Sequence, residues 1–284
     1  MSHDATDILP AWLRRTVISV LLVIVLVPVA YIVVSSLMPD LQVASGRVIP
    51  TVLTTANWRE MWNTVPLQAG LTNSFIVCGV VAAASAFLAI GTAYVLVRFV
   101  FVGRLTFLRS LVGFQSVPGT MLLLPLFVVF SSARTYFGLT IVGTRWGLML
   151  TYLTFALPFA TWVMVTYLRG LPVELEEAGL IDGLGRVGVL RRIVLPLSLP
   201  GLIVAGVFSF LLGWNDVLFA SVLTRPTNRT AAIVLQVFGS QQEGGALPLY
   251  GQVMSSAIVS ALPVVVLYLI FQRYLVGGLT GGVK

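Results

Sequence analysis

The chain has few charged residues and almost none of the side chains on which soluble enzymes depend. Of its 284 residues, 58% are hydrophobic and only 10% are charged, against about 25% charged residues in a typical soluble domain. Its one histidine is His3 and its one lysine is Lys284. These absences exclude histidine-based catalytic triads, H-E-x-x-H zinc sites and the lysine-dependent phosphate loop. The one cysteine, Cys78, lies in an apolar run and is expected to be a small packed hydrophobe.

Long apolar runs take up most of the remaining chain. A transmembrane helix needs about 20 mostly apolar residues, and six segments meet that length. The sequence therefore predicts an all-α integral membrane protein with six transmembrane helices, in one domain over 1–284 whose core spans run from about 71 to 271. The predicted spans are 16–38, 71–97, 110–130, 146–168, 197–223 and 253–271.

The basic residues are divided unequally between the two ends of these spans. Eleven Arg and Lys residues fall on one side and six on the other, and the richer side is expected to be cytoplasmic. Both termini, the tails 1–15 and 272–284, then lie in the cytoplasm. The net charge of +7 does not indicate nucleic acid, because the charges lie between apolar runs and form no basic helix or patch.

The most polar segment is the connector 170–196 between the fourth and fifth spans. Pro172 and the acids after it are typical of a helix start, and Asp182-Gly183 is expected to break that helix. A second short helix then leads to Pro196, where the chain returns to the membrane. These features predict two short helices at the cytoplasmic surface. On this ground alone, an ordinary interfacial loop whose arginines set the topology is the favoured interpretation.

The spacing within the connector resembles a known motif. Glu177-Ala178-Gly179, three residues, Gly183, nine residues, Ile193, one residue and Leu195-Pro196 are similar to the EAA motif of permeases in binding-protein-dependent ABC importers. The departure is Gly179, where the family usually has its second alanine. This exchange is expected to cost the helix about 1 kcal/mol.

The resemblance implies that the connector is a cytoplasmic coupling loop which docks on a separate ATPase subunit. It implies docking residues Glu177, Ala178, Gly179, Asp182 and Gly183, with Ile193, Leu195 and Pro196 completing the motif. The chain itself would bind no cofactor, because ATP and Mg would belong to the partner ATPase. A catalytic site and a metal site are not expected.

Two further segments are similar to carbohydrate-type permeases. One is Gly213-Trp214-Asn215-Asp216, and the other is the ending Q-R-Y-L-V-G-G-L-T-G-G-V-K, which resembles maltose permease G-type subunits. The resemblance makes Trp214, Asn215 and Asp216 candidates for the translocation path or its gate. It implies that the C-terminal residues Gln272, Arg273, Gly278, Leu279 and Thr280 contact the ATPase, although a frayed terminus is the alternative.

Asp216 has three open interpretations. An acid within a span costs on the order of 2.5–3.5 kcal/mol on insertion, so it is usually paired or functional. It can bond neighbouring helices, take part in gating or contact a sugar.

The resemblance covers essentially the whole chain and implies a bacterial plasma-membrane permease subunit for a sugar or sugar-like solute. Maltose-like oligosaccharides, trehalose and glycerophosphodiesters are the solutes it suggests. The implied partners are a second related permease, an ABC ATPase dimer, an extracytoplasmic solute-binding lipoprotein and membrane lipid. The alternatives are an ion-gradient-driven secondary transporter and an intramembrane enzyme. Both normally need ionisable residues within the spans, which here are nearly absent apart from Asp216.

Overall fold

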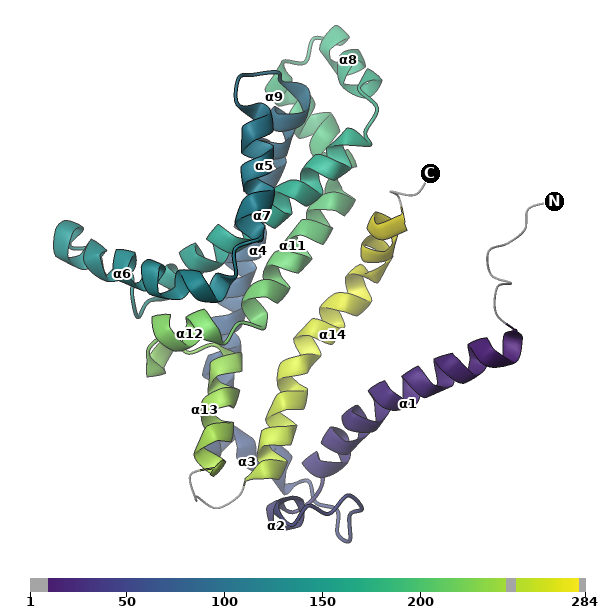
Figure 1. Ribbon diagram of the computed structural model, residues 1–284, viewed down its shortest axis with the longest axis vertical. Coiled ribbons are helices and arrows are strands. Elements are labelled where there is room, and N and C mark those ends of the chain that lie inside the picture. Colours follow the sequence, from purple (N-terminus) through teal and green to yellow (C-terminus); the bar gives the residue numbers. More distant parts are fainter. Residues whose placement is uncertain (1–9, 244–248, 281–284) are drawn as a thin grey trace. The chain divides into compact units, whose positions relative to one another are not determined.

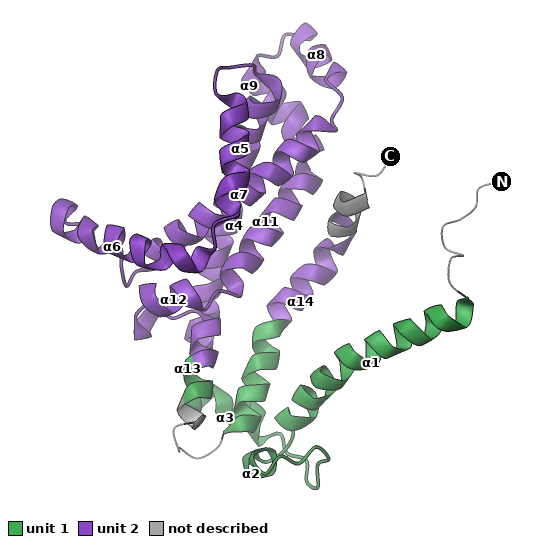
Figure 2. Cartoon of the chain, in the orientation of Figure 1, with its two compact units in different colours: residues 1–65, 237–261 green, residues 66–236, 262–284 purple. Residues whose placement is uncertain are grey.

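The computed structural model describes residues 10–243 and 249–280, and helices make up the regular structure within those ranges. The chain divides into two compact units, Met1–Val65 with Val237–Ala261 and Pro66–Gln236 with Leu262–Lys284 (Figures 1 and 2). Each unit has its own packing. The expectation of one membrane domain over the whole chain stays a prediction.

The first unit contains α1 (Ala11–Ser36), α2 (Asp40–Ala44), α3 (Ala56–Thr64), the end of α13 (Ala231–Glu243) and the first part of α14 (Tyr250–Thr280). Along α1 the apolar side chains are exposed, and of its residues Ser35 and Ser36 are buried. An exposed helix that is apolar on all sides requires an apolar solvent, because in water it would bury one face. The surroundings that fit α1 are therefore lipid.

Polar contacts join the segment after α1 to the start of α14. The buried Asn57 side chain donates to the carbonyl oxygens of Ser36 at 3.0 Å and Met38 at 2.7 Å. Asp40 Oδ1 accepts from the backbone N–H of Gly251 at 2.7 Å, in the first turn of α14. Burial raises the pKa of the Asp40 carboxyl above its ordinary value, and the bond from Gly251 opposes that rise.

The second unit is built on α4 (Leu67–Arg98), α7 (Arg145–Arg169) and α11 (Leu199–Trp214), which pack against one another (Figure 1). Their shared core includes the fully buried alanines Ala89, Ala93, Ala160 and Ala205. Small residues let helix backbones approach closely, which is how membrane helices gain packing energy. The remaining elements of this unit are α5 (Arg104–Gln115), α6 (Gly119–Phe137), α8 (Glu174–Ile181), α9 (Arg186–Val189), the π-helix η2 (Leu190–Val194), α10 (Leu195–Leu197), α12 (Leu218–Leu223) and η3 (Pro226–Asn228).

The predicted all-α membrane fold is confirmed. Within the described ranges five helices are long and apolar enough to cross a membrane: α1, α4, α6, α7 and Tyr250–Tyr274 of α14. A sixth span is available if Arg186–Leu197 and Leu199–Trp214 are taken together, although the two are bent by 74° at Ser198.

The structure corrects the bounds of two predicted spans. The third was expected over 110–130, but the helix stops at Gln115 and a new one starts at Gly119. Pro118 lacks an amide hydrogen and restricts the residue before it, so a helix cannot run through it easily. The fifth was expected over 197–223, but α11 ends at Trp214 and α12 begins only at Leu218.

Candidate functional site

The connector between α7 and α11 forms two short helical segments joined by a tight turn. Helix α8 starts with three acids in its first turn, where the partial positive charge of the helix N-terminus favours them. After α8, Gly183 has φ +84°, a left-handed conformation that favours glycine. From Arg186 the chain is helical again through α9, η2 and α10 up to the bend at Ser198.

One face of α8 is open. Glu177, Ala178 and Asp182 are exposed, and Ile181 is 85% exposed. No hydrogen bond or ion pair joins the Glu177 side chain to another residue in the part of the chain that the structure describes. This face therefore presents an unpaired acid and an aliphatic side chain to the surroundings. We call Glu177, Ala178, Ile181 and Asp182 the outer face of α8.

The opposite face of α8 packs on the second half of the connector. Gly179 is buried, and a Cβ atom at this position would collide with Ile193 Cδ1. The glycine that departs from the motif therefore lies against another residue of the same motif. Of the predicted docking residues, the structure places Glu177, Ala178, Asp182 and Gly183 on the surface and Gly179 inside the loop. Leu195 and Pro196 are exposed.

Sequence reasoning missed the contact that holds α8 to the membrane helices. Arg98, the last residue of α4, donates from Nε to Glu176 Oε1 at 2.7 Å. Its Nη2 also donates to the carbonyl oxygens of Leu168 and Leu171 at 3.2 Å each. Both charged side chains are nearly buried, at 13% and 9% exposure. One guanidinium thus joins α4, the end of α7 and α8.

A second contact holds the next helix of the connector. Phe99 follows Arg98 directly in the sequence, and the Arg186 guanidinium lies 4.8 Å from the centre of the Phe99 ring. Cations are attracted to the face of an aromatic ring at this distance. The end of α4 therefore contacts both short helices of the connector. The sequence signal for this was a basic and an aromatic residue side by side at the end of a predicted span.

The break between α11 and α12 is organised by Asp216. Its Oδ2 accepts from the Tyr152 hydroxyl at 2.8 Å and from the Ala220 amide at 2.9 Å, and its Oδ1 accepts from the Phe219 amide at 3.4 Å. The carboxylate therefore caps α12 and joins it to α7. Of its three interpretations, this geometry favours the bonding of neighbouring helices.

Trp214, the last residue of α11, and Asn215, the first residue of the break, have opposite environments. Trp214 is 5% exposed and stacks on Phe210, with ring centres 5.2 Å apart, in a cluster with Cys78. The expected packed role of Cys78 matches this position. Gly213 allows the close approach, because a Cβ atom there would lie 2.8 Å from the Tyr152 ring. Asn215 is exposed instead and lines a pocket.

That pocket has a volume of about 760 Å³. It lies beside the break between α5 and α6 and the break between α11 and α12. Its walls are mainly aromatic, with Gln115, Asn215 and Asp216 as the polar groups. Trp214 is not among the described residues that line it. The rings of Phe155 and Phe219 are 5.0 Å apart and those of Phe159 and Phe208 are 5.2 Å apart. The aromatic lining residues are Phe114, Tyr152, Phe155, Phe159, Phe208 and Phe219.

The predicted C-terminal contact residues fall partly outside the described side chains. Gln272 and Arg273 are exposed near the end of α14, and Arg273 donates to the Tyr274 hydroxyl at 2.8 Å. Gly278, Leu279 and Thr280 continue the backbone of α14, but their side chains lie outside the described residues. Within the described ranges no group of three or more His, Cys, Asp or Glu is placed to hold a metal ion.

The helices of membrane length and the polar connector are features of an integral membrane protein. The chain belongs to the family of binding-protein-dependent transport system inner membrane components, whose model matches residues 85–280. This confirms the resemblance drawn from the EAA motif. The matched range includes the whole connector and the pocket.

Individual relatives agree with this assignment. The chain is 32% identical to the trehalose transport system permease protein SugB of Mycobacterium tuberculosis, over 90% of this chain and 91% of that one. It is 30% identical to the trehalose/maltose transport system permease protein MalG of Thermococcus litoralis, over 92% and 91% of the two chains. Its fold is similar to a chain in the crystal structure of a bacterial ABC transporter involved in the import of the acidic polysaccharide alginate. That match has a TM-score of 0.76 at 18% identity, over 96% of this chain and 99% of that chain.

Proposed function

We propose that this chain is the permease subunit of an ABC importer that brings a sugar or sugar-like solute into a bacterial cell. The observation that carries the sugar assignment is the aromatic pocket, together with trehalose and maltose permeases among the relatives. The proposed complex contains a second related permease, an ATPase dimer that binds ATP and Mg, and a solute-binding lipoprotein outside the membrane. The chain itself catalyses no covalent step.

The pocket has the chemistry that a sugar requires. Ligand sites are mostly apolar and aromatic, with a few polar groups that fix orientation. The C–H faces of a pyranose ring can pack on Phe155, Phe159 and Phe208, while its hydroxyl groups bond to the carboxamides of Gln115 and Asn215. The Asp216 carboxylate is held by three donors, so its part is to fix the shape of this wall. Disaccharides, oligosaccharides and glycerophosphodiesters remain candidate solutes.

The connector 170–196 is the proposed coupling element. The outer face of α8 would dock on the ATPase, with Glu177 pairing to a cationic group. When the ATPase dimer closes, the movement of α8 would pass through the buried contact of Glu176 with Arg98 to α4 and to the end of α7. The spans would then move between inward-open and outward-open states.

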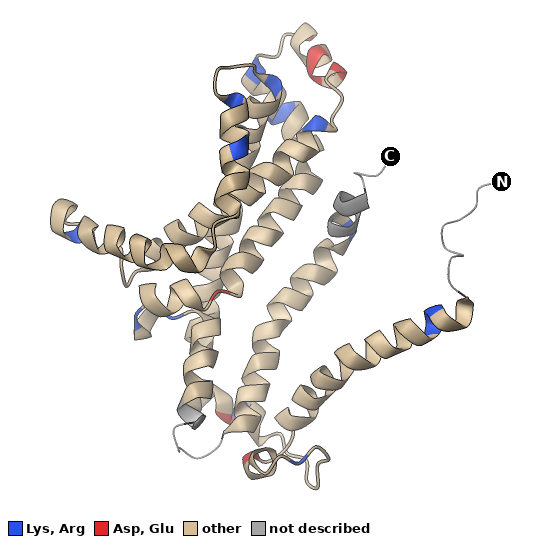
Figure 3. Ribbon diagram, viewed as in Figure 1, with Lys and Arg blue, Asp and Glu red and all other residues tan. Residues whose placement is uncertain are grey.

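This mechanism requires the connector to lie in the cytoplasm. The basic residues of the second unit gather at the end where α5, α8 and α9 lie (Figure 3), and Arg and Lys are enriched in short cytoplasmic loops. We therefore place the connector on the cytoplasmic side, and both termini with it, because an even number of predicted spans returns the chain to the side where it began.

An uptake assay with pocket variants tests the proposal. In cells that express the whole importer, Phe155→Ala and Phe208→Ala should each lower uptake of labelled disaccharide by about tenfold, through loss of ring contacts. Phe87→Ala is the matched control, because Phe87 is 75% exposed on α4 and does not line the pocket. Equal uptake by all three variants would reject the sugar pocket. Uptake that depends on an ion gradient and continues without ATP would favour the secondary transporter.

A further inference from the structure

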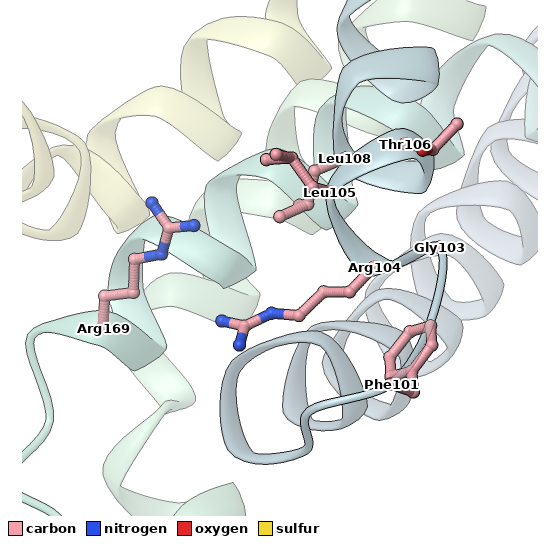
Figure 4. A pocket seen from close by; sticks show the side chains of 7 residues that line it. All are labelled: Phe101, Gly103, Arg104, Leu105, Thr106, Leu108 and Arg169. Carbon is pink, nitrogen blue, oxygen red and sulfur yellow. The ribbon is translucent and has the colours of Figure 1, made fainter.

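A second pocket, of about 370 Å³, lies where the start of α5 meets the end of α7. Arg104 and Arg169 are among its lining residues, together with Phe101, Leu105 and Leu108. Figure 4 shows the two arginine side chains extending into the same space from different helices, with Leu105 and Leu108 beside them. The pocket therefore combines two positive charges with an apolar wall. Neither arginine belongs to the aromatic pocket or to the outer face of α8.

The positive charge in this pocket is not neutralised by the protein. Within the described ranges, neither guanidinium makes a hydrogen bond or an ion pair, and the one ion pair found there joins Arg98 to Glu176. Two like charges that point into one space repel each other unless an anion lies between them. Planar guanidinium groups bind phosphate through paired N–H donors. An anionic group with the chemistry of a phosphate would therefore be attracted to this pocket.

The surroundings indicate that this phosphate belongs to a lipid. Beside the arginines, Val100 is 93% exposed, Val102 is fully exposed and Leu105 is 57% exposed. Aliphatic side chains at such exposure are unfavourable in water but suit the acyl region just below the headgroups, where arginine side chains reach up to the phosphates. A soluble phosphate would not need this apolar border.

We propose that Arg104 and Arg169 bind the phosphate of an anionic phospholipid in the leaflet on the side of the coupling loop. The side of the membrane rests on the topology given under the proposed function, while the binding itself does not depend on the transported solute. Arg169 ends α7 and lies five residues before Glu174, the first residue of α8. A bound lipid would thus hold the end of α7 from which the coupling loop starts.

The test is lipid binding to the purified importer complex. The complex is stripped of lipid in mild detergent, and native mass spectrometry then measures occupancy during titration with phosphatidylglycerol. The double variant Arg104→Gln/Arg169→Gln should bind about twenty-five-fold more weakly than the wild type, at about fivefold for each arginine. Arg109→Gln is the matched control, because it removes the same charge from α5 outside the pocket, and it should bind as the wild type does.

Three results would overturn the proposal. The first is an equal loss of binding in Arg109→Gln, which would show a general effect of charge. The second is equal occupancy by phosphatidylcholine, or full competition by inorganic phosphate at equal concentration, which would show that no anionic lipid is selected. The third is unchanged lipid binding in the double variant together with loss of the ATPase subunit, which would make the pocket a protein contact. Failure of sugar uptake leaves all three readouts unaffected, so the two proposals can fail separately.

Discussion

The two faces of α8 carry adjacent glutamates with opposite environments. The Glu176 side chain is 9% exposed and bonded to Arg98, whereas Glu177 is exposed on the outer face. The same residue type therefore serves two purposes one position apart. The inner glutamate fixes the helix to the membrane spans, and the outer one is available to a partner. In the mechanism we propose, a force applied at the outer face would reach the spans through the bonded inner face.

The largest expected effect comes from breaking the inner contact. Arg98→Gln leaves the Glu176 carboxylate nearly buried without its cation, and losing one partner of a buried ion pair costs roughly 3–5 kcal/mol. Thermal unfolding of the purified complex should show this as a clear loss of stability. The double variant Arg98→Gln/Glu176→Gln should lose less than the sum of the two single variants, because no charge is stranded. Strictly additive losses would mean that the pair is not coupled.

Asp216, a second carboxylate held by hydrogen bonds, extends the comparison to the pocket. Tyr152→Phe removes the hydroxyl donor of Asp216, and a hydrogen bond to a charged group is worth about 1.5–3 kcal/mol. We expect destabilisation in this range, measured by thermal unfolding. Tyr167→Phe is the matched control on the same helix, because its hydroxyl bonds only to the carbonyl of Leu197 at 3.2 Å, and it should cost about 1 kcal/mol. An equal loss of stability in both variants would show that the hydrogen bond from Tyr152 to Asp216 contributes no more than the neutral bond of Tyr167.

A smaller effect tests the packing between α8 and the second half of the connector. Gly179→Ala restores the usual residue of the motif and gains about 1 kcal/mol in helix propensity, but its Cβ atom meets Ile193 Cδ1. Because that atom ends a flexible side chain, we expect a net change of no more than about 1 kcal/mol. Gly179→Ala combined with Ile193→Val should be more stable than Gly179→Ala alone. If Ile193→Val does not raise the stability of the Gly179→Ala variant, the side chains at the two positions are not in contact.

The sequence was sufficient for the membrane fold, for the family and for the order of the polar segments. Apolar length identified the spans, because the bilayer sets one thickness for all of them. It failed where a helix stops within an apolar run. Pro118 and the pair Asn215-Asp216 interrupt the third and fifth predicted spans, and hydropathy averages over such short interruptions.

The candidate site could be predicted only in part. The EAA spacing located the connector, but it could not separate Glu176 from Glu177, because their difference depends on Arg98, which is 78 residues away from Glu176. The aromatic pocket was missed for a similar reason. Its walls come from α5, α6, α7, α11, α12 and the two breaks between α5 and α6 and between α11 and α12, and single phenylalanines in apolar spans carry no signal of their own.

The most direct test of the account is a co-purification with the outer face reversed in charge. The chain is tagged at its N-terminus, purified from native membranes in mild detergent as wild type, Glu177→Arg and Glu60→Arg, and the ratio of ATPase to permease is measured. Glu60→Arg makes the same change of charge in α3, at a position outside the connector 170–196. The account predicts that the wild type and Glu60→Arg retain the ATPase and a second permease. For Glu177→Arg, the ratio of ATPase to permease should fall at least about tenfold. Its unfolding temperature should stay unchanged, because an exposed substitution has little effect on stability. An ATPase retained by Glu177→Arg, or a chain that purifies alone in all three forms, would contradict it.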